Sequence, residues 1–363
     1  MKGTGAVSEA NWSTPTVAHS PASDETGTHA SAQIGVILGQ VGTPQNLARS
    51  EVRRYLKEFL SDQRIIDLPA WRWQPILRGA ILPVRPGPVG HHFGEIWTEQ
   101  GSPLQVISDA QRDGIQRRLG EGYRVELGMA YSEPSIGGAV ARLEAAGIRK
   151  IVVLPMFPQY SNSTTASIYD AVMFHALGRG KRKGLPVKKF APTLRFIHPY
   201  YDDPDYIAVL ADSVRRQLAE GDAPDKLLVS FHGLPKRFVE EGDPYQSQVH
   251  ETVRLLTEAL GLAPEQWELG YQSRFGRTEW IKPYLQPRLE ELHGDGVEKP
   301  VIVSPGFTAD CLETLHELGI QGRELFEKGG GDGAQYRTIS CLNDDPAWLD
   351  YAAGLIRKNA GGW

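Results

Sequence analysis

Two groups of residues have the types and spacing that metal chemistry needs, and the first centres on one histidine. His232 lies in the segment SFHGLP (230–235), where an apolar run ends beside Gly233. An imidazole at such a place can act as a base or as a metal ligand, because its ordinary pKa is about 6.5. A structural role for this histidine is the alternative, since most isolated histidines have one.

The second group is acidic. Asp310, Glu313 and Glu317 are spaced by three and four residues, so on an α-helix they would share one face. This helix is expected to begin straight after the apolar segment 300–307. Imidazole and carboxylate together suit a borderline divalent metal such as Fe²⁺. The alternatives are a helix cap at Asp310 and a solvated acidic face.

A third group could hold a planar anionic ligand. Ser273 and Arg274 follow an apolar run in the segment QSRFG (272–276), and Trp280 comes shortly after. A hydroxyl-rich loop, 160–165, stands at the matching place in the first half of the chain. The Gly-x-Pro turns at 42–44 and 233–235 lack the glycine spacing of nucleotide-binding loops, so no nucleotide is expected.

Eight short apolar runs must position these residues. They are too short for helices and are bounded by Gly or Pro, which is typical of buried parallel strands. Amphipathic stretches such as 107–119 and 204–219 lie between them, and this alternation predicts an α/β fold. The runs are 34–40, 125–131, 150–157, 194–200, 226–233, 267–273, 300–307 and 336–342.

The two halves of the chain resemble each other. LLVSFHGLP (227–235) matches VILGQVGTP (36–44), and VIVSPGFTADCLET (301–314) matches VVLPMFPQYSNST (152–164). We therefore predict two similar domains, each a four-stranded parallel sheet flanked by helices. A ligand cleft is expected between them, at the carboxyl ends of the strands. Chance similarity is the alternative.

The expected organisation has four parts. Residues 1–32 offer no periodic apolar face, which predicts a disordered tail. The first domain covers 33–192 with an insertion at about 64–105, the second covers 193–345, and a C-terminal helix covers 346–363.

The insertion combines apolar and basic residues. Its segment 68–88 carries Trp71 and Trp73 together with Arg72, Arg78 and Arg85. Such a surface suits an apolar anionic ligand or a peripheral membrane contact. A core helix followed by a proline-rich loop is the alternative.

Composition excludes several classes of protein. The 363 residues include 39 Lys and Arg against 44 Asp and Glu, for a net charge of −5, which argues against a nucleic-acid binder. Two cysteines cannot form a disulfide framework or a zinc cluster. No apolar run reaches the length of a membrane span, and no secretory signal is recognisable. A cytoplasmic location is expected.

At these motifs the chain resembles the ferrochelatases, enzymes that insert Fe²⁺ into a porphyrin to complete haem. The resemblance is closest to the bacterial, soluble members, and its motifs run in the family's order from about residue 34 to the C-terminus. Four long motifs carry it: LPMFPQYSNSTTAS (154–167), SFHGLPKRFVEEGDPY (230–245), YQSRFGRTEWIKPYL (271–285) and SPGFTADCLETLHEL (304–318). Shorter matches are VGTP (41–44), YLKEFLSD (55–62), IWTEQGSPL (96–104) and CLNDDPAW (341–348).

The resemblance implies a chelatase-like fold around a porphyrin cleft. In this reading 64–90 forms a lip over the macrocycle, and 346–363 packs on the first domain. The family's metal-site histidine corresponds to His232 and its essential glutamate to Glu313, with Asp310 and Glu317 as an acidic route. Further candidate porphyrin contacts are Tyr160, Tyr131, Thr43, Ser273, Arg274 and Trp280.

The chain departs from the family pattern at several positions. Gln40 replaces an asparagine, Ala130 replaces an arginine, and Phe157 stands where tyrosine is common. The segment 246–249 lacks the cysteines of cluster-bearing members. Because a [2Fe–2S] cluster needs four protein ligands and the chain has two cysteines, no cofactor is expected beyond the substrate Fe²⁺.

The expected activity is Fe²⁺ insertion into protoporphyrin IX, with coproporphyrin III as the alternative substrate. His232 would accept a pyrrole proton or hold iron transiently, with Glu313 opposing it. Rival interpretations are a non-catalytic porphyrin- or haem-binding relative, a cobalt or nickel chelatase for a corrin-type ring, and a solute-binding protein. A monomer is favoured.

Overall fold

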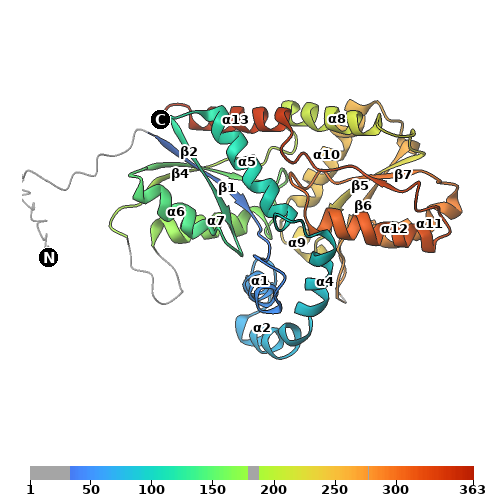
Figure 1. Cartoon of the computed structure of the whole chain (residues 1–363), viewed down its shortest axis with the longest axis horizontal. Coiled ribbons are helices and arrows are strands. Elements are labelled where there is room, and N and C mark those ends of the chain that lie inside the picture. The colour runs from blue at the N-terminus through green and yellow to red at the C-terminus, as the bar shows by residue number, and fades with distance from the viewer. Residues whose placement is uncertain (1–32, 179–187, 277) are drawn as a thin grey trace, which may run out of the picture.

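The computed structural model describes residues 33–178, 188–276 and 278–363. The predicted N-terminal tail, 1–32, lies outside the described residues. Two four-stranded sheets form the body of the molecule, the first at the left of Figure 1 and the second at the right. Every strand pair in both sheets is parallel.

The two sheets have the same topology, which confirms the predicted α/β fold. The first has the order β2-β1-β3-β4 and the second the order β6-β5-β7-β8. All eight strands fall within or next to the apolar runs seen in the sequence. They are β1 (Ile34–Gln40), β2 (Tyr123–Met129), β3 (Lys150–Pro155), β4 (Thr193–Phe196), β5 (Lys226–His232), β6 (Trp267–Gln272), β7 (Pro300–Val303) and β8 (Arg337–Thr338).

Helices cover the sheets, and capping residues set where several of them begin. Asp203 and Asp345 each accept a hydrogen bond at the start of a helix whose first residue is proline, a favourable arrangement for a helix N-terminus. The helices around the sheets are α5 (Pro103–Leu119), α6 (Ile136–Ala145), α7 (Thr165–Leu177), α8 (Pro204–Leu218), α9 (Lys236–Glu240), α10 (Tyr245–Leu260), α11 (Leu285–Glu291), α12 (Gly322–Lys328) and α13 (Pro346–Ala360).

The largest hydrophobic core runs through both halves of the molecule. It includes Val36 and Leu38 of β1, Val229 of β5 and Trp348 of α13, all fully buried. Removing a side chain as large as Trp348 from such a core costs about 3–5 kcal/mol. The shared core holds the strand ends of the two sheets in a fixed relation.

The first domain extends beyond its expected end at residue 192. β4 is hydrogen-bonded to β3, with Leu194 opposite Ile151, so the expected boundary between 192 and 193 is wrong. It would separate β4 from the strand that completes its hydrogen bonds. On β4, Arg195 donates to the carbonyl oxygens of Asn359 and Gly361. These bonds tie the end of the chain to the first sheet.

The insertion forms a helical projection below the sheets (Figure 1). It joins α1 (Arg49–Ser61) to α2 (Ala70–Ile76), a π-helical turn (Leu77–Ile81), α3 (Leu82–Val84) and α4 (Pro86–Ile96). The alternative of a proline-rich loop is wrong, because Pro83 and Pro86 stand in the first turns of α3 and α4, where no amide hydrogen is needed.

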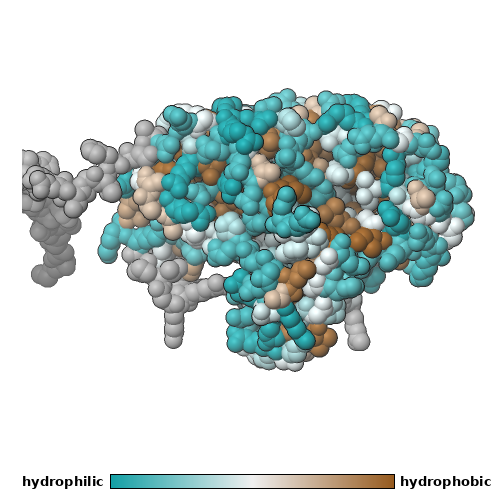
Figure 2. Space-filling model, viewed as in Figure 1, coloured by the Kyte–Doolittle hydropathy of each residue, from teal (hydrophilic) through white to brown (hydrophobic). Residues whose placement is uncertain are grey.

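This projection, residues 49–96, has a small core of its own. Val52, Leu56, Leu77 and Leu82 are buried together. Its outer surface is apolar in places: Trp71 is 72% exposed and Val84 is 66% exposed. Figure 2 shows this hydrophobic colouring at the lower end of the molecule.

Candidate functional site

The loops after the strands of both sheets meet between the two halves. Thr308, which follows β7, donates to the carbonyl oxygen of Met156 after β3 at 2.9 Å. The loop after β3 has a second contact with the other half of the molecule, because the Tyr160 amide donates to the side chain of Gln248 on α10 at 2.7 Å. These contacts bring the candidate residues of the two halves toward one region, as expected for carboxyl ends of parallel strands.

His232 is the last residue of β5 and is only partly buried. Its Nδ1 lies 2.7 Å from the carbonyl oxygen of Gly233. A carbonyl can only accept, so Nδ1 carries a proton, and in the neutral form of the ring Nε2 then has a free lone pair. This tautomer is the one able to accept a proton or bind a metal through Nε2. The ring of Trp280 lies 6.4 Å away.

Glu313 lies in the first turn of a π-helix, η4 (Leu312–Gln321). Its carboxylate is next to the thiol of Cys311, whose pKa is raised by burial and further by Glu313. The thiol therefore stays protonated beside Glu313. Tyr55 of the projection is also close, and burial followed by the Glu313 charge raises its pKa. A neutral thiol and a neutral phenol thus flank this carboxylate.

Asp310 does not share a helical face with the two glutamates. The helix is a π-helix rather than an α-helix and begins at Leu312, so the spacing expected from an α-helix is wrong here. The Asp310 side chain is buried and turned inward. It accepts from the Thr314 hydroxyl at 2.8 Å and from the Asn343 amide at 2.7 Å.

Glu317 lies one turn beyond Glu313 and is bound by neighbouring donors. It accepts from both the amide and the hydroxyl of Ser273. It also accepts from the side-chain amides of Gln272 and Gln286. The structure therefore brings Ser273 to Glu317.

Gln272 begins the candidate segment 272–276 but was given no role of its own from the sequence, yet it connects the central elements of the site. This fully buried side chain accepts from the Ser230 hydroxyl at 2.7 Å and donates to the backbone oxygen of Glu313 at 3.0 Å. Its own carbonyl oxygen accepts from the Gly233 amide at 2.9 Å. A polar residue at the end of an apolar strand was the available signal.

Thr43 and Tyr131 come together at the end of the first sheet. Both line a small cavity with Tyr55. Thr43 shares a hydrogen bond with Ser102 at 2.7 Å, and the Tyr131 hydroxyl donates to Asp62 at 2.7 Å. Burial raises the pKa of Tyr131, so it remains a neutral donor.

Tyr160 has a basic neighbour that the sequence did not reveal. Burial raises the pKa of Tyr160, and the nearby Arg64 guanidinium opposes this shift. Arg64 itself is ion-paired with Asp170 and donates to Asn162 at 2.7 Å. Its charge is therefore already partnered within the protein.

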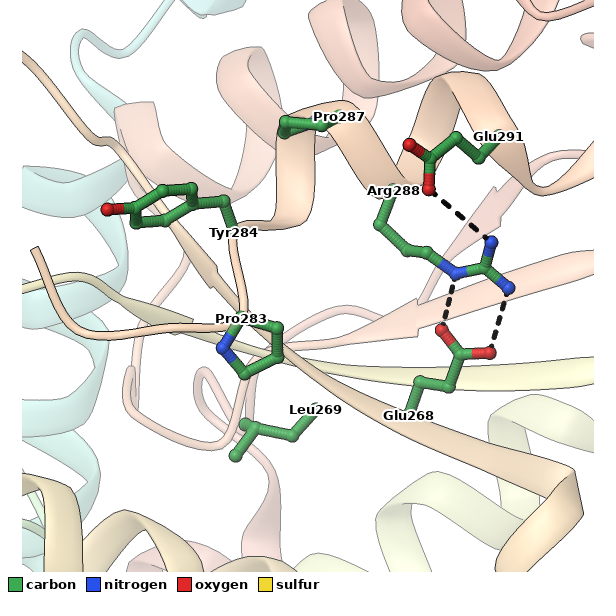
Figure 3. A pocket seen from close by; sticks show the side chains of 7 residues that line it. All are labelled: Glu268, Leu269, Pro283, Tyr284, Pro287, Arg288 and Glu291. Carbon is green, nitrogen blue, oxygen red and sulfur yellow. Dashed lines mark hydrogen bonds and ion pairs between the residues drawn. The ribbon is translucent and has the colours of Figure 1, made fainter.

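Arg274 lies beside Tyr284, whose hydroxyl donates to the backbone carbonyl oxygen of Trp280 at 3.2 Å. It is exposed, and its guanidinium lies 4.5 Å from the ring centre of Tyr284. Tyr284 lines an open cavity of about 510 Å³ against β6 and α11 (Figure 3). The other lining residues are Glu268, Leu269, Pro283, Pro287, Arg288 and Glu291. None of the predicted site residues lines this cavity.

The projection contacts the π-helix directly. His316 of η4 is buried, and its Nε2 lies 2.8 Å from the Glu95 carboxylate of α4. The His92 ring stacks on His316 with centroids 4.2 Å apart. Burial, followed by His316, lowers the pKa of His92. This contact joins the projection to the helix that carries Glu313.

Within the described ranges, no three His, Cys, Asp or Glu side chains converge as a metal cage. A closed cage of protein ligands is typical of a structural metal, which the protein keeps. The candidate ligands His232 and Glu313 are instead separate groups, one on β5 and one on η4.

Comparisons with known proteins identify related sequences and folds. The family model described as Ferrochelatase matches residues 33–360. A ferrochelatase of Azoarcus sp. is 43% identical over 334 residues, which cover 92% of this chain and 89% of the relative. A ferrochelatase of Actinobacillus pleuropneumoniae is 46% identical over 327 residues, covering 89% of this chain and 98% of the relative.

Solved structures add evidence on the fold. SirB from Bacillus subtilis, solved with Fe³⁺, aligns with a TM-score of 0.53 at 12% identity. The alignment covers 91% of this chain and 96% of SirB. At this identity the likeness concerns the fold alone.

Proposed function

The chain belongs to the ferrochelatase family, and we propose that its porphyrin substrate is protoporphyrin IX. As a metal chelatase of the lyase class, it works on Fe²⁺ as a substrate in haem biosynthesis. Protoporphyrin IX carries two carboxylates and coproporphyrin III carries four. The substrate proposal therefore depends on how many cations the site can offer.

The observation that supports protoporphyrin IX is that three arginines of the projection are already bonded within the protein. Arg49 and Arg53 each donate to a backbone carbonyl oxygen of the projection at 2.6 Å. Arg64 is paired with Asp170. Guanidinium groups that are already bonded contribute less to extra carboxylates, which favours the less acidic porphyrin.

For the chemistry, we propose roles for His232 and Glu313. Metal insertion releases two pyrrole protons, so two acceptors must act in turn. The free Nε2 of His232 suits one proton. The Glu313 carboxylate suits the second proton or a transient bond to Fe²⁺, because imidazole and carboxylate both bind this metal. Burial of the macrocycle provides the free energy to bend it toward the metal.

The test is anaerobic metallation of each porphyrin with Fe²⁺ or Zn²⁺, followed by absorbance. Saturable turnover with a kcat/KM at least tenfold higher for protoporphyrin IX supports the proposal. Preference for coproporphyrin III contradicts the substrate assignment. Tight porphyrin binding without turnover would point to a non-catalytic relative.

We also propose a peripheral membrane contact through segment 68–88. Exposed Trp71, Ile76 and Val84 lie on the same projection as Arg72 and Arg78. Apolar residues next to basic ones suit an anionic lipid surface. No helix in the described ranges is long and apolar enough to cross a bilayer. Co-sedimentation with phosphatidylserine vesicles should be lost in Trp71→Ser.

Three further assignments remain proposals. We propose that the chain holds no iron–sulfur cluster, because it has two cysteines in all, fewer than a cluster needs. The cytoplasm is the proposed compartment, where free thiols such as Cys311 persist. A monomer is the proposed oligomeric state, which light scattering on a sizing column would check.

A further inference from the structure

We propose that Glu317 is a positioning residue that holds Glu313 in place rather than a carrier of metal or protons. In this arrangement its carboxylate fixes the π-helix η4 to the ends of β6 and α11. The inference rests on the proposed role of Glu313, which lies one turn earlier on the same helix.

The hydrogen bonds of Glu317 fill its carboxylate. Oε1 accepts from the Ser273 amide at 2.7 Å and from Gln286 at 2.8 Å. Oε2 accepts from the Ser273 hydroxyl and from Gln272 at 3.2 Å. An ionised carboxylate has about four acceptor sites, and four donors occupy them. Binding a metal would require breaking several of these charge-assisted bonds.

The donors to Glu317 come from two different elements, β6 and α11, and from the residue that follows β6. Gln272 ends β6, and Gln286 lies in the first turn of α11. Ser273 has a φ of +64°, which is uncommon for a residue with a side chain. In this conformation both its amide and its hydroxyl point at Glu317. A single carboxylate therefore connects η4 to two neighbouring elements.

Asp310 holds the other end of the π-helix in a similar way. Its carboxylate accepts from Thr314, from Asn343 and, at 3.3 Å, from the Cys341 amide. Its own amide donates back to the Asn343 side chain at 2.8 Å. The carboxylates of both acidic neighbours of Glu313 thus already accept hydrogen bonds from donors within the protein.

Glu313 is different from these two carboxylates. Within the described residues its side chain interacts with the neutral Cys311 thiol and lies near the neutral Tyr55 phenol. In the described part of the chain, no basic side chain forms a salt bridge with it. Of the three acidic residues, Glu313 is the one whose oxygens are available to a substrate. A fixed helix keeps that carboxylate at one place relative to His232.

The experiment compares removal of the charge with removal of a donor. Glu317→Gln removes the charge, whereas Gln286→Leu removes one donor and leaves the Glu317 charge in place. Glu317→Asp keeps the charge but withdraws it by one methylene. Glu324→Gln, an exposed carboxylate on α12, is the matched control. Steady-state kcat and the KM for Zn²⁺ are measured with protoporphyrin IX, and thermal melting checks folding.

For a positioning role, we expect Glu317→Gln and Glu317→Asp to lower kcat about tenfold. Gln286→Leu should lower kcat about threefold, and the KM for Zn²⁺ should stay within twofold throughout. The double variant Glu317→Gln/Gln286→Leu should be no more than twofold slower than Glu317→Gln alone, because both changes break the same contact.

A metal-carrying role gives a different pattern and would overturn the inference. Glu317→Gln would then raise the KM for Zn²⁺ about tenfold, Glu317→Asp would retain most activity, and Gln286→Leu would behave like wild type. If Glu317→Gln does not fold, Gln286→Leu decides on its own by the same kcat and KM criteria. Absence of turnover in the wild-type protein would instead contradict the proposed function.

Discussion

The side-chain amide of Gln272 donates to the backbone carbonyl oxygen of Glu313 at 3.0 Å. Gln272 is also the residue opposite His232 in the parallel pairing of β5 with β6. Gln272 therefore pairs with His232 through its backbone and with Glu313 through its side chain, although those two residues are 81 positions apart in the sequence (313 − 232). The distance between a base and a metal-binding carboxylate matters for catalysis, because small displacements lower the rate steeply.

Gln272→Leu should destabilise the protein and slow the reaction. The change leaves the Ser230 hydroxyl and the Glu313 carbonyl without their partner, at a cost of about 1–3 kcal/mol for each buried unpaired group. Urea unfolding measures the loss. Gln100→Leu, at an exposed position, is the control. Equal midpoints for both variants would show that the Gln272 contacts are not important.

His232→Ala should abolish metal insertion while leaving the fold intact. Loss of a general base lowers rates by about 10²–10⁴-fold, and among the described residues this partly buried side chain makes one hydrogen bond, to its neighbour Gly233. Anaerobic zinc insertion measures the rate, and thermal melting checks the fold. His250→Ala, exposed on α10, is the control. Normal turnover by His232→Ala would remove His232 from the mechanism.

Glu313→Gln should reduce kcat about a hundredfold with little change in stability. The amide keeps the size of the side chain but loses its basicity and most of its affinity for Fe²⁺. Because Glu313 makes no salt bridge within the described residues, folding should not depend on its charge. Stopped-flow metallation measures the rate. A less than threefold effect would place the metal path elsewhere.

The sequence predicted the strands well because each is a short apolar run bounded by turn residues. The run 34–40 corresponds to β1 without change, and the matching order of the two sheets follows from the repeated motifs. Buried parallel strands leave such a pattern because both faces are covered. The same reasoning placed His232 at a strand end.

The chemistry around Glu313 was less predictable. The spacing of Asp310, Glu313 and Glu317 suggested a common α-helical face, but a π-helix has a different turn and no simple sequence signature. Tertiary donors such as Gln286 decide whether a carboxylate is free or bonded. Those partners lie far away in the sequence, so periodicity carries no information about them.

The contact between His316 and Glu95 should restrain the projection. His316→Ala or Glu95→Gln removes a 2.8 Å contact between η4 and α4. Glu95 is partly exposed, so we expect a modest effect, about 0.5–1 kcal/mol. Limited proteolysis within 70–96 should become faster in each single variant. The double variant should be cleaved no faster than either one; additive effects would argue against a direct coupling.

Stability at acid pH should depend on the pair Glu268–Arg288. The Arg288 guanidinium donates to both oxygens of Glu268, at 2.7 and 3.0 Å (Figure 3). This bonding to Arg288 lowers the pKa of Glu268 from its ordinary value of 4.5. A carboxylate with a depressed folded-state pKa stabilises the fold above its unfolded-state pKa, and that contribution disappears as the pH falls through the folded-state value.

Glu268→Gln should therefore be less stable than wild type at pH 7, and the difference should shrink below about pH 4.5. The group is partly exposed, so the difference at pH 7 is expected to be small, about 1 kcal/mol or less. Urea unfolding at pH 7 and pH 3 measures it. Glu265→Gln, exposed and close by in the sequence, should show no such pH dependence. An equal difference at both pH values would mean that Glu268 contributes through packing rather than through its charge.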